Sequence, residues 1–497
     1  MTTGSVEGGV AQLTLKMQWR VLSAVLLVGA GCVIAPRGEA GVFQGVWSDP
    51  LFTQDLAVAV PGQAWTRRPH GLPKSGPPAR IAFSEPMSLA ALTAFALAHN
   101  PATRVAFANL QAAAYGLGVA DSAFFPTLTF SDSATRAQAN TTAGFSIPIQ
   151  NVDSGALSLS YVLLDFGARA AQREQALAQV YVAGFDNNSA LQSVALSVTQ
   201  NYYQLIGEQA LVRAYHQTAR EDRASLDAAQ IKRQSGLATI SDVLQARAAL
   251  AQAQSDWIAA QAQMRADMGG LAESCGLPAD EKVPVMPLDV SRPPPLLTPS
   301  LRSLMRRAER NNPSILASSA QVVASHATVR ADEAAGLPSI DVTGTAGKRF
   351  QATLGPSQNW SVSVNVRVPI FGGFKDAYQI QQARAQERSA QASLAEQTQK
   401  IDMTVYQDYE TVLGARSAAG AARLAVASAR ASLTAIKAQY KVGLATMLDV
   451  LTAQATLTTA EQTAIQDVTT AYVQLANLAD ALGYIGLPAR AARKGAL

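Results

Sequence analysis

Two short stretches of the sequence place a hydroxyl and a carboxylate three residues apart, shortly after a glycine. The first contains Thr239 and Asp242, and the second contains Thr446 and Asp449. A threonine so placed caps the N-terminus of a helix, and a carboxylate three residues later is stabilised by the same helix end. Two hypotheses follow: the pairs act as caps alone, or they are caps that also narrow an opening at the end of the helices.

Chemistry of other kinds has little support in the sequence. The four histidines show no metal-ligand spacing, and there is neither a phosphate-binding glycine loop nor a nucleophile motif. These features argue against an enzyme, and no cofactor or metal is expected. The net charge is only +4 and no run of Lys and Arg stands out, so nucleic acid is not an expected partner either.

The composition indicates which elements could position the two carboxylates. Charged residues make up 15% and aromatic residues 6% of the 497 residues, while Ala, Gln, Ser and Thr fill long stretches. Charge is well below the usual share of about 25%. Such a chain suits thin layers of long, closely packed helices better than a thick core.

The N-terminus resembles an export signal. Lys16 and Arg20 precede the apolar run Val21–Ala30, which is too short to span a bilayer. Translation could start at Met1 or at Met17. After the signal, no apolar run approaches the roughly 20 residues that a membrane helix needs, so an exported chain would be soluble or would cross the outer membrane as strands.

Two processing sites compete in this segment. Ordinary cleavage after Ala40 gives a signal peptide over 1–40, whereas lipidation of Cys32 gives a lipoprotein signal over 1–31. Cys275 is the only other cysteine and would then have no partner, so a disulfide framework is not expected. Residues 41–85 carry Gly and Pro without periodicity and are interpreted as an extended N-terminal arm.

An internal repeat organises the remaining chain. Ser235–Leu244 matches Val442–Leu451 about 207 residues later, and Asn100-Pro101 and Gly276-Leu277-Pro278 also have counterparts, at Asn312-Pro313 and Gly486-Leu487-Pro488. We therefore predict repeat 1 over 86–278 and repeat 2 over 298–488. A Pro-rich linker over 279–297 joins them, and 489–497 form a C-terminal tail.

Each repeat has the same predicted plan. An Ala-rich helix, about 87–122 or 299–334, ends at a proline. A hairpin of alternating strands follows, over 126–165 or 338–370, in which every second residue is apolar, as at Trp360, Val362 and Val364. Long helical runs, about 168–233 and 376–440, then lead to the turns 234–241 and 441–448, where Gly236 and Gly443 suit the left-handed conformation that ends a helix.

The hairpins favour a membrane barrel over a soluble sandwich, which would alternate in the same way. Long helices flank each hairpin and cannot supply a second sheet. Aromatic residues also gather at the helix–strand junctions, as in the belts of membrane barrels: Phe124, Phe125, Phe166, Phe371 and Phe374. Four strands cannot close into an open barrel, whereas three subunits would supply about twelve.

The chain resembles the TolC-like outer-membrane efflux protein family over nearly all of its predicted mature length. The resemblance depends on both Gly-Leu-Ala-Thr turns and on motifs found in register in the two repeats: Leu164–Gly167 with Gln175–Ala178, and Pro369–Gly373 with Gln382–Ala385. It implies an α+β membrane protein of two internal repeats. Its homotrimer would form a twelve-stranded β-barrel in outer-membrane lipid, four strands from each subunit, continued by a long α-helical barrel through the periplasm.

The resemblance also implies partners and site residues. A periplasmic membrane-fusion adaptor would contact the turns at Gly236, Leu237, Gly443 and Leu444, and an RND or ABC pump would lie in the inner membrane. Asp449 matches an aspartate that narrows the tunnel in relatives, but Thr452 stands where a second carboxylate is usual. The entrance should therefore bind cations less strongly. Asp242 in repeat 1 is followed by Gln245, so any constriction should be asymmetric.

The resulting hypothesis is an exit duct that passes drugs, small molecules or a secreted protein from pump and adaptor to the exterior. The alternative is a structural periplasmic coiled-coil protein that does not conduct. The sequence does not distinguish drug efflux from protein secretion, because the pump selects the cargo.

Overall fold

The computed structural model describes residues 85–138, 149–287, 292–295, 299–351 and 355–484. The predicted signal sequence, Cys32 and the predicted C-terminal tail lie outside these residues, and of the predicted arm only Glu85 is described.

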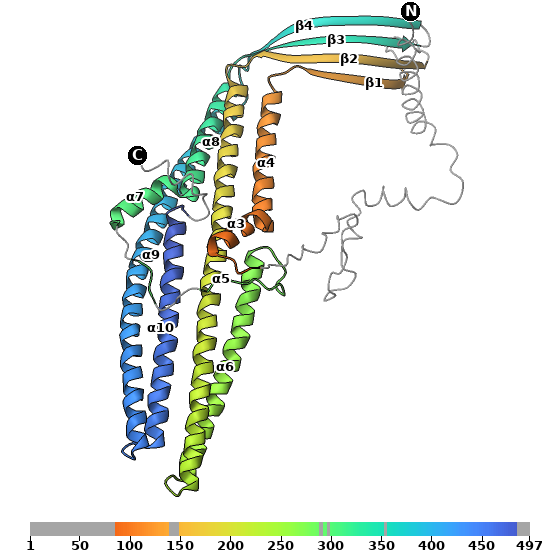
Figure 1. Cartoon of the computed structure of the whole chain (residues 1–497). Coiled ribbons are helices and arrows are strands. Elements are labelled where there is room, and N and C mark those ends of the chain that lie inside the picture. The colour runs from red at the N-terminus through yellow and green to blue at the C-terminus, as the bar shows by residue number, and fades with distance from the viewer. Residues whose placement is uncertain (1–84, 139–148, 288–291, 296–298, 352–354, 485–497) are drawn as a thin grey trace, which may run out of the picture. The chain divides into compact units, whose positions relative to one another are not determined.

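The element order repeats itself once along the chain (Figure 1). Each half contains two short helices, two strands, a helix of 67 residues and a helix of 35 residues. The first half runs through α3 (Leu89–His99), α4 (Pro101–Ser122), β1 (Thr127–Ala137), β2 (Gln150–Leu164), α5 (Ala168–Gln234) and α6 (Ile240–Ser274). The second runs through α7 (Leu301–Asn311), α8 (Pro313–Ala335), β3 (Ser339–Gln351), β4 (Gly355–Arg367), α9 (Lys375–Lys441) and α10 (Met447–Ala481).

The prediction of one continuous helix before each hairpin was wrong. The chain breaks at Asn100 and at Asn312, each of which has extended backbone and is followed by a proline at the first position of the next helix. Proline disfavours the helical conformation for the residue before it but fits the first helical turn. Each asparagine also caps the new helix, since Asn100 Oδ1 accepts from Ala102 N at 2.8 Å and Asn312 Oδ1 accepts from Ser314 N at 3.0 Å.

The four strands form one antiparallel sheet in the order β1-β2-β3-β4. Residues directly opposite each other share a face of a sheet, so the register defines two faces. One face carries hydroxyls: Thr127, Thr129, Ser158, Ser160, Thr343, Thr345, Ser361 and Ser363. The other is mainly apolar and exposed, with Leu128, Phe130, Leu157, Leu159, Trp360, Val362 and Val364. The predicted alternation is therefore confirmed.

The sheet stays open at both sides, because in the described chain β1 pairs only with β2 and β4 only with β3. The aromatic residues predicted at the junctions, Phe124, Phe125, Phe166, Phe371 and Phe374, are all exposed. Phe166 and Phe374 have left-handed backbone, with φ of 49° and 65°, where the chain turns from strand to helix. Bulky residues rarely adopt this conformation, so the turn at each junction is sharply constrained.

The long helices pack as two antiparallel pairs, α5 with α6 and α9 with α10, while α8 contacts both α5 and α9 (Figure 1). At about 1.5 Å per residue, α5 and α9 are each about 100 Å long. Matching apolar side chains fill the two cores: Leu92, Val198, Leu205 and Leu271 in the first repeat, and Leu304, Val405, Val412 and Leu478 in the second. None of the helices in the described ranges combines the length and the apolar character needed to cross a membrane.

Candidate functional site

The two helix turns, 234–241 and 441–448, are built in the same way. Gly236 and Gly443 have φ of 74° and 82°, the left-handed conformation that ends α5 and α9. The next residue closes each turn, since Leu237 N donates to Lys232 O at 2.8 Å and Leu444 N donates to Gln439 O at 2.9 Å. This hydrogen-bonded turn leaves the two leucine side chains in solvent, 76% and 79% exposed. The four residues predicted to meet an adaptor therefore all lie on the exposed rim of the turns.

Both turns are followed by a complete capping box, as the sequence predicts. At α6, Asp242 N donates to Thr239 Oγ1 at 3.3 Å, and Thr239 N donates to Asp242 Oδ2 at 2.8 Å. At α10 the corresponding distances for Thr446 and Asp449 are 3.2 Å and 2.8 Å. The two carboxylates thus satisfy helix-end donors that would otherwise lack a partner.

The Asp449 carboxylate is exposed and ionised at neutral pH. Hydrogen bonds from the side chain and the backbone of Thr446 hold its pKa below the usual value. Thr452, one helical turn further along α10, is exposed as well, and Gln245 is its exposed counterpart on α6. The structure therefore provides one fixed negative charge near the start of α10 and a neutral hydroxyl one turn later.

Contacts that the sequence reasoning missed join the two helix pairs close to the turns. Lys232 Nζ donates to Tyr440 O at 2.7 Å and lies 3.6 Å from the centre of the Tyr440 ring. Beneath this contact, apolar side chains of α5, α6 and α10 form one cluster that includes Leu226, Val243 and Met447. The turns of the two repeats are thereby held side by side.

A second link lies further from the turns. Lys437 Nζ donates to Glu221 Oε2 at 2.8 Å, which connects α9 to α5. Asp222 beside it is buried, and burial together with the charge of Glu221 raises its pKa to about 6. A signal for this residue was present in the sequence, because Asp222 falls on the apolar seam between Ala219 and Leu226.

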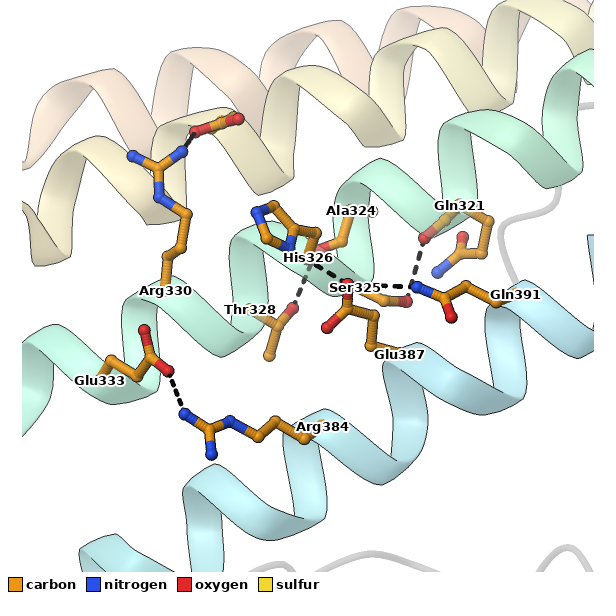
Figure 2. Close-up of polar contacts among 11 residues, drawn as sticks. Gln321, Ala324, Ser325, His326, Thr328, Arg330, Glu333, Arg384, Glu387 and Gln391 are labelled. Carbon is orange, nitrogen blue, oxygen red and sulfur yellow. Dashed lines mark hydrogen bonds and ion pairs between the residues drawn. The ribbon is translucent and has the colours of Figure 1, made fainter.

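Polar contacts also join α8 to its neighbouring helices, as Figure 2 shows. His326 Nδ1 lies 3.1 Å from Glu387 Oε1, and Arg384 donates to Glu333 at 2.8 Å. Both pairs join α8 to α9, while Arg330 pairs with Glu174 of α5. No group of three or more His, Cys, Asp or Glu side chains that could hold a metal ion occurs in the part of the chain that the structure describes.

An open sheet with one exposed apolar face, continued by paired long helices, fits the class of proteins in which a sheet contacts a membrane and helices extend away from it. The model of the family described as outer membrane efflux protein matches residues 92–277 and 304–484. The chain therefore belongs to the outer membrane efflux protein family and is located in the outer membrane, as its resemblance to TolC-like proteins predicts.

Two relatives match over most of their length, and a third matches over about a third of it. The chain is 28% identical to protein CyaE of Bordetella pertussis, covering 87% of this chain and 84% of the relative. It is 27% identical to the toluene efflux pump outer membrane protein TtgC of Pseudomonas putida, covering 93% and 94%. It is also 27% identical to outer membrane protein TolC of Escherichia coli, covering 33% of this chain and 36% of the relative.

Solved structures share the fold. The outer-membrane channel OprN superposes with a TM-score of 0.72 at 22% identity, covering 80% of this chain and 91% of that one. The outer membrane protein VceC of Vibrio cholerae gives a TM-score of 0.69 at 20% identity, covering 80% and 96%. The predicted combination of long helices with a four-stranded antiparallel sheet is confirmed by the fold.

Proposed function

We propose that the chain is one subunit of a homotrimeric exit duct, with a twelve-stranded barrel in the outer membrane and a helical tunnel in the periplasm. The observation that supports this most strongly is the open sheet: four strands with an exposed apolar face and an unpaired edge on each side. In lipid every backbone polar group must be paired, so a spanning sheet has to close. Four strands are too few, whereas three copies, each pairing β4 with β1 of the next, would supply about twelve.

The helices support the same assembly. The 67-residue helix α5 contains seventeen buried residues, whereas α9, of equal length, contains seven. Exposed apolar side chains remain on α9, among them Tyr378, Met403 and Leu424. A helix of about 100 Å with so little burial gains stability when it packs beside helices of another copy. Side-by-side packing of three copies would close the helices into a tube.

The turns are proposed to meet a periplasmic membrane-fusion adaptor through Gly236, Leu237, Gly443 and Leu444, whose rim position leaves them free for contact. An inner-membrane pump of the RND or ABC type would then supply energy and select the cargo. Both drug efflux and protein secretion are compatible with such a duct.

Asp449 is the proposed constriction residue, with Thr452 and Asp242 as weaker contributors. Three copies would bring three ionised Asp449 carboxylates together, and converging like charges attract cations. Repeats over 86–278 and 298–488, the linker over 279–297, and a signal over 1–40 or 1–31 complete the proposed organisation, with Cys32 lipidated only in the second case.

Planar-bilayer recording distinguishes the duct from a structural coiled-coil protein that does not conduct. We expect discrete channels from the purified trimer in lipid. A homogeneous trimer that inserts and passes no current at any voltage would contradict the proposal and favour the alternative.

A pair of neighbouring substitutions on β4 tests the lipid-facing side directly. Val364 lies on the apolar face and Ser363 on the hydroxyl face. An arginine on the lipid face of a barrel costs about 2–4 kcal/mol near the bilayer midplane, whereas the lumen face accepts charge. Val364→Arg should therefore prevent insertion into lipid vesicles, while Ser363→Arg should insert and conduct. Equal insertion of both variants would argue against a membrane barrel.

A further inference from the structure

Helix α9 has fewer helix neighbours in the described chain than its counterpart α5. Helix α5 packs against α4 and α6 of its own repeat and also against α8 and α10 of the other repeat (Figure 1). Helix α9 packs against α8 and α10, but within the described residues it does not pack to a comparable extent against α4 or α6. One side of α9, and the sides of α4 and α6 that face away from α5, are therefore left open within a single chain.

A glycine marks the close approach between α5 and α10. An added Cβ at Gly207 would lie 2.6 Å from Thr469 Oγ1 and 3.4 Å from Thr469 Cβ, so the two helices can approach only because Gly207 has no side chain. Gly414 occupies the same position in α9, 207 residues later. An added Cβ at Gly414 meets nothing within 4 Å. The second repeat thus keeps a glycine that destabilises its helix but, within the chain, has no helix packed against it.

A pair of opposite charges lies one helical turn away at matching positions. The rings of Tyr203 on α5 and Tyr472 on α10 stack with their centroids 4.9 Å apart. The position that matches Tyr203 on α9 is Glu410, and the position that matches Tyr472 on α6 is Arg265. Both are exposed, and neither forms an ion pair within the described residues. Since α9 and α6 do not meet inside one chain, these complementary charges can pair only between two molecules.

A third contact continues the match along the same helices. Thr218 Oγ1 of α5 lies 2.9 Å from Thr458 Oγ1 of α10. The matching residues, Ala425 on α9 and Ala251 on α6, are both exposed. Ala262, which matches Thr469, is exposed as well. Because helix separation depends on the side chains at the contact, these alanines and Gly414 suit a close approach of α6 to α9.

Helix α4 extends this open surface. Its counterpart α8 packs on both α5 and α9 and buries Ala317 and Ala327. The shift that leads from Asn312 back to Asn100 places Val105 and Tyr115 at the matching positions of α4, where they are 60% and 74% exposed. Large apolar side chains gathered on an open surface indicate contact with another molecule.

We propose that α9 of one copy binds α4 and α6 of the next copy in the register in which α5 binds α8 and α10 within the chain. Gly414 then lies against Ala262 of the next copy, and Glu410 forms an ion pair with Arg265 of the next copy. The inference rests on the proposed homotrimer and adds the register in which its helices meet. Contacts within chains and contacts between chains would alternate around the tube and share one geometry.

Disulfide cross-linking of the purified, detergent-solubilised full chain tests this register. A disulfide joins Cβ atoms about 3.5–4.5 Å apart, close to the 3.4 Å between an added Cβ at Gly207 and Thr469 Cβ. Gly414→Cys combined with Ala262→Cys should therefore link copies on mild oxidation and give covalent trimers on a non-reducing gel. The natural protein, with its buried Cys275, reports the background.

Ala421→Cys combined with Ala262→Cys is the matched control for register. Ala421 is exposed on the same side of α9 as Gly414, but it lies two turns further along, roughly 10 Å away. This distance is beyond the reach of a disulfide. The control pair should therefore show no more cross-linking than the natural protein.

Reversal of the charges gives an independent measurement. Glu410→Arg and Arg265→Glu each place like charges at the contact, so each should lower the temperature at which the trimer dissociates. The double variant restores opposite charges and should recover the natural temperature. Losses that simply add in the double variant would contradict the ion pair.

Light scattering separates failure of the register from failure of the trimer. A trimer in which Gly414→Cys with Ala262→Cys forms no more disulfide than the Ala421→Cys control would overturn the register and leave the proposed duct intact. A natural protein that remains monomeric would overturn both proposals.

Discussion

The two repeats hold their helix junctions with the same backbone contact but fill them with different side chains. In repeat 1, Asn100 Nδ2 donates to Ser274 O at 2.8 Å, and in repeat 2, Asn312 Nδ2 donates to Ala481 O at 3.0 Å. Near this shared hydrogen bond the polar side chains differ, because repeat 1 has the amide of Asn201 where repeat 2 has the carboxylate of Asp408. The two repeats thus share the geometry of this junction, whereas its chemistry is specific to each repeat.

Nearer the turns the difference is reversed, because there the first repeat contains the acidic side chain and the second does not. There the buried acid Asp222 belongs to repeat 1, and its counterpart in repeat 2 is the buried Ala429. The link from Lys232 to Tyr440 likewise has no equivalent made by Gln439, the matching residue of repeat 2. Such differences occur where the repeats contact each other, and this contact is unequal, because α10 packs against α5 whereas the matching helices α6 and α9 do not pack together to a comparable extent.

The largest expected effect concerns the tightly packed glycines that both repeats have at their helix junctions. A Cβ at Gly276 would lie 2.7 Å from Asn100 Cα, and one at Gly483 would lie 2.5 Å from Asn311 O. Both glycines also have positive φ, at 77° and 78°. Gly276→Val and Gly483→Val should each destabilise by about 2–6 kcal/mol, from backbone strain together with overpacking. Thermal unfolding followed by circular dichroism measures the loss.

Gly116→Ala serves as the control for this pair, because a Cβ there meets nothing within 4 Å and alanine favours a helix. Its midpoint should stay the same or rise slightly. If only one valine variant lost stability, the junctions at Gly276 and Gly483 would not be structurally equivalent.

A smaller effect is expected from the buried acid of repeat 1. An aspartate ionises near pH 4 in the unfolded chain, whereas Asp222 has a pKa of about 6 in the folded protein. The folded state thus retains a proton that the unfolded state releases, so stability falls as the pH rises from about 4 to about 6 and then levels off. Asp222→Ala should add on the order of 1 kcal/mol above pH 6 and nothing below pH 4.

Unfolding midpoints at a series of pH values check this expectation. The pH dependence should weaken without disappearing, because burial also raises the pKa values of Asp408 and Asp480. A lower midpoint for Asp222→Ala at pH 7.5 would instead assign a stabilising role to the carboxylate.

The contact between Lys232 and Tyr440 should affect the opening of the proposed duct entrance more than the stability of the fold. Lys232→Met keeps the length of the side chain but removes the ammonium that contacts Tyr440. A hydrogen bond with a cation–π contact is worth about 1 kcal/mol, so a duct entrance that opens by separating the two turns should show an open probability about fivefold higher in single-channel records. Gln439→Met, the matched change in repeat 2, should leave it unchanged. An equal change in open probability in Lys232→Met and Gln439→Met would contradict the expected asymmetry between the two turns.

The most subtle expected change concerns ions at the entrance. Asp449→Ala should weaken cation block and cation selectivity, Asp242→Ala should weaken them less, and Thr452→Asp should strengthen them, since added carboxylates concentrate cations. Reversal potentials in a salt gradient report the selectivity. Unchanged selectivity in Asp449→Ala would leave this carboxylate with its capping role alone.

Features set by local pattern could be predicted from the sequence. The strand alternation at Trp360, Val362 and Val364 and the capping boxes at Thr239 and Thr446 depend on residues a few positions apart, and the structure confirms them. The helix breaks at Asn100 and Asn312 were missed although the Asn-Pro pairs were evident, because the Ala-rich periodicity on both sides suggested one helix.

Contacts between the repeats could not be predicted. Tyr440 approaches Lys232 only because the two helix pairs pack together, and Asp408 comes close to Asp480 only because α9 turns back into α10. The proximity of Asp408 to Asp480 therefore has no sequence signature. The constriction and adaptor residues stay predictions, since they depend on copies and partners beyond this chain.

The open edges of the sheet also affect how the protein is made. In a single copy, before the proposed trimer forms, β1 and β4 each offer a row of unpaired backbone groups next to an apolar surface that includes Phe130 and Trp360. Such an edge pairs with any strand it meets, whether from a sister chain or from an unrelated one. Productive assembly therefore competes with aggregation, and the balance between them depends on the concentration of newly exported chains and on how long each waits in water before reaching lipid.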